Sequence, residues 1–148
     1  MKLIDYLGLR LKSEPVLELI LHEDLQITYN PDLLHENFPD WCAAACKSKG
    51  FEVRFDQDQM LDTIWCYFIE TNGFNPIRPD LVGAQICGNI DEARNIAMSV
   101  GAGFEFRENV DCFGVMVSWA KILQSDKSIH YEFGDDGLRL VTLMATGR

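Results

Sequence analysis

The sequence predicts an α+β protein in which one broad antiparallel β-sheet carries helices on one face. Two segments have helical patterning with capping residues, and several others alternate apolar and polar residues at the period of two that strands require. These segments follow in the same order in the two halves of the chain. One domain, residues 1–148, accommodates them, because 148 residues with 47% hydrophobic and 11% aromatic content can bury a core.

The first half begins with a helix and continues with strands. Ser13 is a preferred N-cap, Pro15 suits a first turn, and apolar residues continue to an end near Glu23 or Asp24. LQITY, GFEVRF and LDTIWCYFI are typical of strands, the last of a central one. A polar loop, NPDLLHENFPD, follows the first of them. The secondary structure of WCAAACKSK is left undecided. Its alanines favour a helix, whereas the match between the two halves favours a strand.

The second half repeats that order after the joint NGFNPIRPDLVG. A helix is expected to start near Asn89, where Glu92 completes a capping box, and to stop at Gly101. Four strand-like runs follow: GFEFREN, FGVMVSWAKIL, SIHYEFG and LRLVTLMA.

Two strand–turn–strand segments match best between the halves. Phe55 corresponds to Phe133, Asp58 to Asp136, and Ile64 to Val141. The sequence therefore predicts two tandem repeats, about residues 1–75 and 76–148, each a helix plus about four antiparallel strands. Joined edge to edge, they would form one sheet with helices on one face and the other face free for contact. Pairing of an edge strand with a second copy stays open.

The acidic composition limits the classes of partner. A net charge of −10 and a pI near 4.6 argue against nucleic-acid binding, which needs a basic surface. Residues 1–75 carry a net charge of −7 and residues 76–148 one of −3, so a basic partner should prefer the first half. No segment has the pattern of a signal peptide or a membrane span, and the five cysteines form no regular framework. The expected location is the cytoplasm, with reduced and mostly buried thiols.

No catalytic or metal-binding pattern stands out, and we expect neither an enzyme nor a cofactor. Cys42-x3-Cys46 lacks a second close Cys/His pair for zinc, and core thiols are the simpler interpretation. His130 and Glu132 point to the same face of one strand, as an acid–base pair would, but a solvated strand face is the simpler interpretation. Four aspartates resemble fragments of a calcium loop, but tight hairpins account for them: Asp56, Asp58, Asp135 and Asp136.

Aromatic residues in loops are the other candidates for contact. Trp65 and Trp119 lie in predicted strands and are expected in the core. Trp41, beside Asp40 at the end of a polar loop, is the tryptophan expected to be exposed, and Phe74 lies on a predicted turn. Tryptophan is over-represented among binding hot spots, and loops carry function more often than core positions do.

The tandem arrangement is similar to the fold of the β-lactamase inhibitory protein and of related outer-membrane-assembly lipoprotein domains. GFEVRFDQDQMLDTIWCYF and SIHYEFGDDGLRLVTLMA also resemble segments of bacterial immunity proteins encoded beside polymorphic toxins. The resemblance implies a non-catalytic cytosolic inhibitor that occludes the active site of a protein toxin, for example a basic nuclease. The alternatives are an adaptor or chaperone-type binding domain and a small-ligand-binding α+β domain. The residues expected to contact the partner are Asp40, Trp41, Asp56, Asp58, Glu70, Phe74, Glu132, Asp135 and Asp136.

Overall fold

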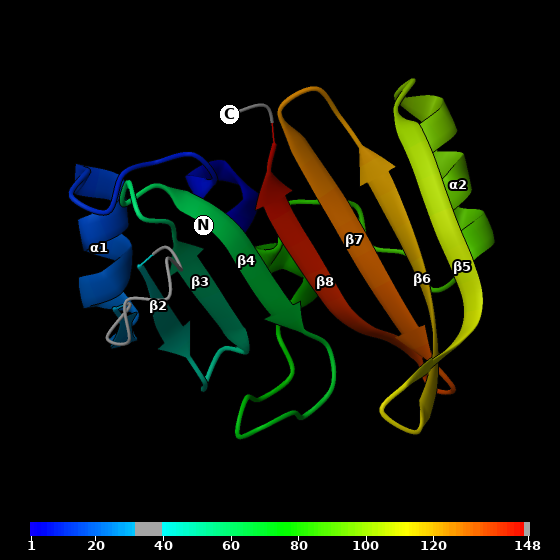
Figure 1. Cartoon of the computed structure of the whole chain (residues 1–148), viewed down its shortest axis with the longest axis horizontal. Coiled ribbons are helices and arrows are strands. Elements are labelled where there is room, and N and C mark those ends of the chain that lie inside the picture. The colour runs from blue at the N-terminus through cyan, green and yellow to red at the C-terminus, as the bar shows by residue number, and fades with distance from the viewer. Residues whose placement is uncertain (32–39, 147–148) are drawn as a thin grey trace.

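A computed structural model describes residues 1–31 and 40–146 of the chain, so most of the predicted loop NPDLLHENFPD, including His35, lies outside the described residues. The described part forms one eight-stranded antiparallel sheet in the order β1-β2-β3-β4-β8-β7-β6-β5, with two α-helices and two short 3-10 helices (Figure 1). The strands are β1 (Gln26–Asn30), β2 (Trp41–Cys46), β3 (Phe51–Phe55), β4 (Leu61–Tyr67), β5 (Gly103–Cys112), β6 (Val115–Leu123), β7 (Lys127–Gly134) and β8 (Gly137–Ala145). The helices are η1 (Leu3–Tyr6), α1 (Glu14–His22), η2 (Pro79–Leu81) and α2 (Ile90–Ser99).

The predicted α+β class and the broad antiparallel sheet are confirmed. β1 to β4 form one meander and β5 to β8 a second, and they join where β4 pairs with β8. Of the helix and the strand considered for WCAAACKSK, the structure has the strand, β2, which pairs with both β1 and β3. β4 occupies an interior position of the sheet, as its β-branched and aromatic residues indicated.

Both α-helices begin where the sequence indicated. Ser13 has the extended backbone of an N-cap, but its hydroxyl donates to the carbonyl oxygen of Arg10, 2.6 Å away, and does not cap the helix. At α2 the side-chain oxygen of Asn89 accepts a hydrogen bond from the backbone N–H of Glu92 at 2.9 Å, and the Glu92 carboxylate accepts one from the N–H of Gly88 at 2.6 Å. These bonds satisfy N–H groups that have no partner inside the helix.

One face of the sheet, here called the covered face, holds the hydrophobic core. Alternate residues of the strands point to it, and Phe51, Val53 and Tyr131 are among those with no exposed surface. Val16 and Leu19 of α1 and Ala93 and Ala97 of α2 belong to the same buried cluster, so both helices pack on this face. The segment 68–89 between β4 and α2 also runs across it, behind the sheet in Figure 1.

A close backbone contact holds the segment 68–89 against the first meander. Gly50 adopts a φ of +82°, and a Cβ added there would lie 2.1 Å from the carbonyl oxygen of Asn75. Asn75 donates its backbone N–H to the carbonyl oxygen of Lys47, and Ile77 donates to that of Tyr67. Only glycine allows this approach, which brings the segment beneath the turn between β2 and β3.

No helix in the described part of the chain is both long and apolar enough to cross a bilayer.

Candidate binding surface

The opposite side of the sheet, here called the open face, carries all three tryptophans. The strand registers place two rows of side chains across it. The first row runs Glu52, Trp65, Thr142, His130, Lys121 and Glu105, from β3 to β5. The second row runs Tyr67, Leu140, Glu132, Trp119 and Arg107, from β4 to β5. The described helices pack on the covered face, so these rows face away from them.

The tryptophans of the open face are only half-buried, and each has a polar or charged neighbour. Trp119 stacks on His130 with 5.2 Å between ring centroids. The guanidinium carbon of Arg54 lies 5.7 Å from the centroid of the Trp41 ring, a cation–π distance. Trp65 sits opposite Thr142 at the junction of the two meanders. The surface is therefore aromatic without being closed to water.

Several polar groups on this face are poorly satisfied. A register shift between β3 and β4 places Asp62 beside Thr63, opposite Arg54. The Arg54 Nε and Asp62 Oδ1 atoms lie 4.0 Å apart, and both are buried atoms without a hydrogen-bond partner in the described structure. Ser128 Oγ is a third such atom. Burying polar atoms in this way costs stability.

His130 lies between an aromatic neighbour, Trp119, and a basic one, Lys121. Burial, and then the positive charge of Lys121, lower the pKa of the imidazole below its ordinary value. Glu132 points to the same face, as the alternation of β7 indicated, but the ring partner of His130 is Trp119. The site favours a neutral imidazole at physiological pH.

The expected environments of the tryptophans need correction. Trp65 and Trp119 were expected in the core, but both are half-buried on the open face. Trp41 was expected in a loop, but it is the first residue of β2 and is likewise half-buried. Alternation shows which residues share a face, but not which face the helices cover.

Phe74 was expected to contact a partner from an exposed turn, but only 6% of its surface is accessible to solvent. It lies on a turn as predicted, but the turn is folded back, and its ring centroid is 4.4 Å from that of Tyr67. Lys47 Nζ lies 5.7 Å from the same ring. Phe74 therefore stabilises the segment 68–89 and is not available as an exposed anchor.

The remaining predicted contact residues fall at the two ends of the strands. Asp40, Asp56 and Asp58 lie at the end where β3 turns into β4, and Asp56 Oδ1 accepts hydrogen bonds from the N–H groups of Asp58 and Met60, at 2.9 and 3.0 Å. The other three, Glu70, Asp135 and Asp136, are exposed at the opposite end, where β7 turns into β8. The structure thus brings them together as two acidic borders, with Glu132 and Trp41 on the face between.

Two small hollows lie beside these borders. One, of about 260 Å³, is lined by residues of the first border together with Tyr29, Cys42 and Gln59. The other, of about 230 Å³, is lined by Asp135, Asp136, Arg139, Ile69, Val115 and Met116. Each combines acidic and apolar groups, which suits a cationic side chain with an aliphatic stem.

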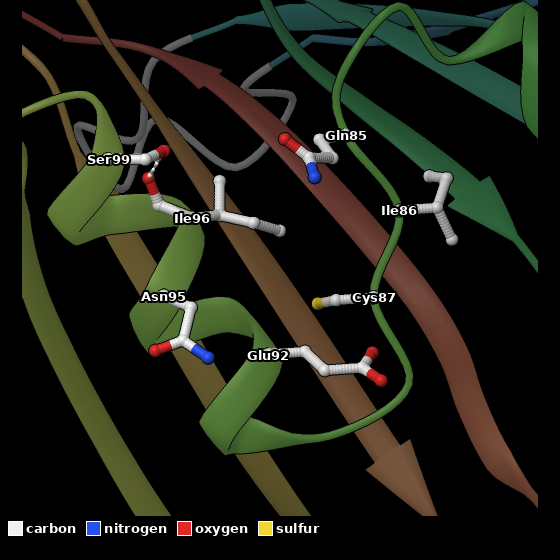
Figure 2. Close-up of a pocket in the computed structure, with 7 residues that line it drawn as sticks. All are labelled: Gln85, Ile86, Cys87, Glu92, Asn95, Ile96 and Ser99. Atoms are coloured by element: carbon white, nitrogen blue, oxygen red, sulfur yellow. Dashed lines mark hydrogen bonds between the residues drawn. The ribbon is translucent and has the colours of Figure 1, made fainter.

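A larger groove, of about 450 Å³, lies on the covered side between α2 and the segment 84–88 (Figure 2). Three of its polar groups have partners: Glu92 accepts from Gly88, Ser99 donates to the Ile96 carbonyl, and the Gln85 carbonyl accepts from the Tyr131 hydroxyl at 2.7 Å. Burial, and then the charge of Glu92, raise the pKa of the Cys87 thiol to about 12. Cys87 is therefore protonated at neutral pH and is a poor nucleophile.

The cysteines are free thiols in varied settings. Cys46 and Cys66 are buried, and burial raises the pKa of Cys66 to about 12. Cys42 is half-buried and Cys112 is exposed. Within residues 1–31 and 40–146, no three His, Cys, Asp or Glu side chains gather as a metal site.

Sequence reasoning missed the tip of the hairpin between β5 and β6. Phe113 is fully exposed there and has a φ of +52°, a conformation that disfavours bulky side chains. The dipeptide Phe113-Gly114 between two strand-like runs was the available signal for a two-residue turn. Tyr67 and Arg54 were also missed, although period-two alternation places both beside tryptophans.

Comparisons with protein-family models, curated proteins and solved structures found no match to this chain.

Proposed function

We propose that this protein is a non-catalytic cytosolic immunity protein, which binds a basic bacterial toxin and occludes its active site. The observation that carries the proposal is the open face, on which three half-buried tryptophans share an eight-stranded sheet. Tryptophan, tyrosine and arginine are the residues that dominate the binding energy of protein interfaces. A rigid sheet presents them with little loss of conformational entropy on binding.

The distribution of charge supports a basic partner. The centre of the open face is aromatic, and acidic turns border it at both ends, with Asp58 at one and Asp135 and Asp136 at the other. Apolar centres with polar rims are the usual anatomy of protein interfaces. A net charge of −10 would accelerate encounter with a cationic protein and give the rate a strong salt dependence.

The state of the cysteines supports the cytosolic location. The five thiols are free, and three of them, Cys46, Cys66 and Cys87, are buried. Reduced thiols are usual in a reducing compartment.

We test the function in two steps. The tagged protein is used as bait in lysate of its source organism, at low and at moderate salt, and captured proteins are identified by mass spectrometry. The captured protein is then expressed alone in a bacterial host and together with this chain. The proposal requires a basic protein that stops growth when alone and is neutralised by co-expression. A captured protein without toxicity would favour an adaptor or chaperone-type domain instead.

Matched variants tie the function to the open face. Trp119→Ala and Trp65→Ala should each weaken the complex by about tenfold to a hundredfold, since they remove central aromatic contacts. Asp136→Lys should weaken it less and reduce its salt dependence, because it alters the rim. Leu21→Ala, an exposed change on α1, serves as the control with unchanged binding. Equal losses for Leu21→Ala and Trp119→Ala would refute the assignment of the open face.

The groove of Figure 2 favours one alternative, a small-ligand-binding domain. Its volume of about 450 Å³ lies within the range of small-molecule sites. A thermal-shift screen with common metabolites tests it directly. A ligand whose stabilising effect disappears in Asn95→Leu, a change in the groove wall, would support this alternative over the immunity function.

The order of elements also supports descent of the two halves from one repeated unit. If Ile64 corresponds to Val141, then Cys66 corresponds to Leu143. The observed ladder pairs Ile64 with Leu143 and Cys66 with Val141, as a two-fold axis through the Trp65–Thr142 pair would require. An experimental structure in which the two meanders fail to superpose about that axis would refute the duplication.

A further inference from the structure

We infer that the outer edge of β5 pairs with β5 of a second copy of this chain, forming a symmetric dimer with one continuous sheet. β5 is the terminal strand of the sheet, and its ten residues (Gly103–Cys112) pair with β6 on one side. Within the described residues no strand pairs with its other side. A long edge of this kind presents unpaired N–H and C=O groups to another strand.

The charges of β5 are self-complementary in one register. When an antiparallel pair obeys two-fold symmetry, directly opposed residues must share a face, so each residue is opposed by one an even number of positions away. Centring the pair on Phe106 places Glu105 opposite Arg107 of the second copy, and Arg107 opposite its Glu105. Two opposite-charge pairs form, one on each side of the axis.

The neighbouring registers are disfavoured by the same two residues. Centring the pair on Glu105 opposes two carboxylates, and centring it on Arg107 opposes two guanidinium groups, each of which is destabilising. The shift between Arg107 and Val110, where Asn109 has a φ of +54°, limits regular pairing to the first part of the strand. Only the register centred on Phe106 opposes Glu105 to Arg107, so the charges favour this self-pairing.

Apolar groups on the covered side reinforce this register. Phe106 lies on the axis, is 45% exposed, and has the Arg94 guanidinium 5.0 Å from its ring. The Phe106 side chains of the two copies would meet on the axis and bury one another. The paired edge lies one strand beyond Trp119, and a dimer extends the sheet sideways, so the open face stays accessible.

Sedimentation velocity and light scattering over a wide range of protein concentration test the inference. The wild-type protein should show a monomer–dimer equilibrium. Glu105→Arg and Arg107→Glu should each raise the dissociation constant by at least about tenfold, because each replaces two attractive pairs by two repulsive ones. The double variant, Glu105→Arg with Arg107→Glu, restores both pairs and should recover most of the wild-type affinity.

Asp126→Arg is the matched control, since it changes the net charge equally at the exposed turn between β6 and β7. Circular dichroism melting of every variant checks that the fold is retained. A monomer at the highest soluble concentration would overturn the inference. So would a dimer that neither single variant weakens, which would place the contact at β1 or on a face, or a double variant no tighter than the single ones.

Discussion

The two faces of the sheet come from the same strands but differ in what they bury. On the covered face, Phe51, Val53 and Tyr131 are fully buried beneath helices and the segment 68–89. On the open face, Trp65, Trp119 and their neighbours keep part of their surface in water. Consecutive residues of one strand therefore have opposite environments, as Cys66 and Trp65 do.

The difference also extends to polar groups. On the covered face the Tyr131 hydroxyl donates to the Gln85 carbonyl, so a deeply placed polar atom has a partner. On the open face Arg54 Nε, Asp62 Oδ1 and Ser128 Oγ are buried without a hydrogen-bond partner among residues 1–31 and 40–146. A face selected only for stability would satisfy or remove such atoms. The comparison indicates that stability shapes the covered face, whereas another requirement, which we propose to be binding, shapes the open one.

The largest expected effect is the loss of a covered-face ring. Phe51→Ala should destabilise the protein by about 3–5 kcal/mol, because it leaves a cavity in the closed core. Trp65→Ala, one strand away on the open face, should cost about half as much or less, since its ring is already partly hydrated. Urea unfolding monitored by circular dichroism gives both values. Equal costs would remove the energetic distinction between the faces.

The sequence predicted the positions of the strands better than it predicted which face of the sheet the helices cover. Period-two alternation placed β3 and β7, and the cap at Asn89 placed α2, because these signals act within a few residues. Whether Trp119 is core or surface depends on which side α2 and the segment 68–89 pack, and that is decided by contacts distant in sequence. Phe74 shows the same limit: its turn is a local feature, whereas its burial needs the close approach at Gly50.

The next effect concerns alkaline pH and the covered face. Burial raises the pKa of the Cys66 thiol to about 12, above its ordinary value near 9. The folded thiol thus stays protonated while the unfolded one ionises, so the stability from this group is complete below pH 9 and is lost as the pH rises toward 12. We expect a loss of about 1–2 kcal/mol by roughly pH 10.5. Denaturant titrations should show a shallower alkaline decline in Cys66→Ala than in the wild type.

A smaller effect at acid pH belongs to the open face. Burial and Lys121 lower the pKa of His130 in the folded state, so the unfolded chain binds more protons below about pH 6.5. Stability from this group is therefore present above that pH and is lost as the pH falls. The groups facing the imidazole are Trp119, Lys121, Glu132 and Thr142. Melting temperatures from pH 7 to pH 5 should fall less in His130→Gln than in the wild type, and identical slopes would contradict this account.

The smallest effects come from two serines that should respond with opposite signs. Ser128 Oγ is buried on the open face and has no hydrogen-bond partner in the described part of the chain, so Ser128→Ala should raise stability by up to about 1 kcal/mol. Ser118 Oγ accepts a hydrogen bond from the N–H of Asn109 at 3.1 Å, so Ser118→Ala should lower stability by about 0.5–1.5 kcal/mol. Both changes remove one hydroxyl, so their difference isolates hydrogen bonding from volume. Destabilisation of Ser128→Ala would mean that the open face is as well satisfied as the covered one.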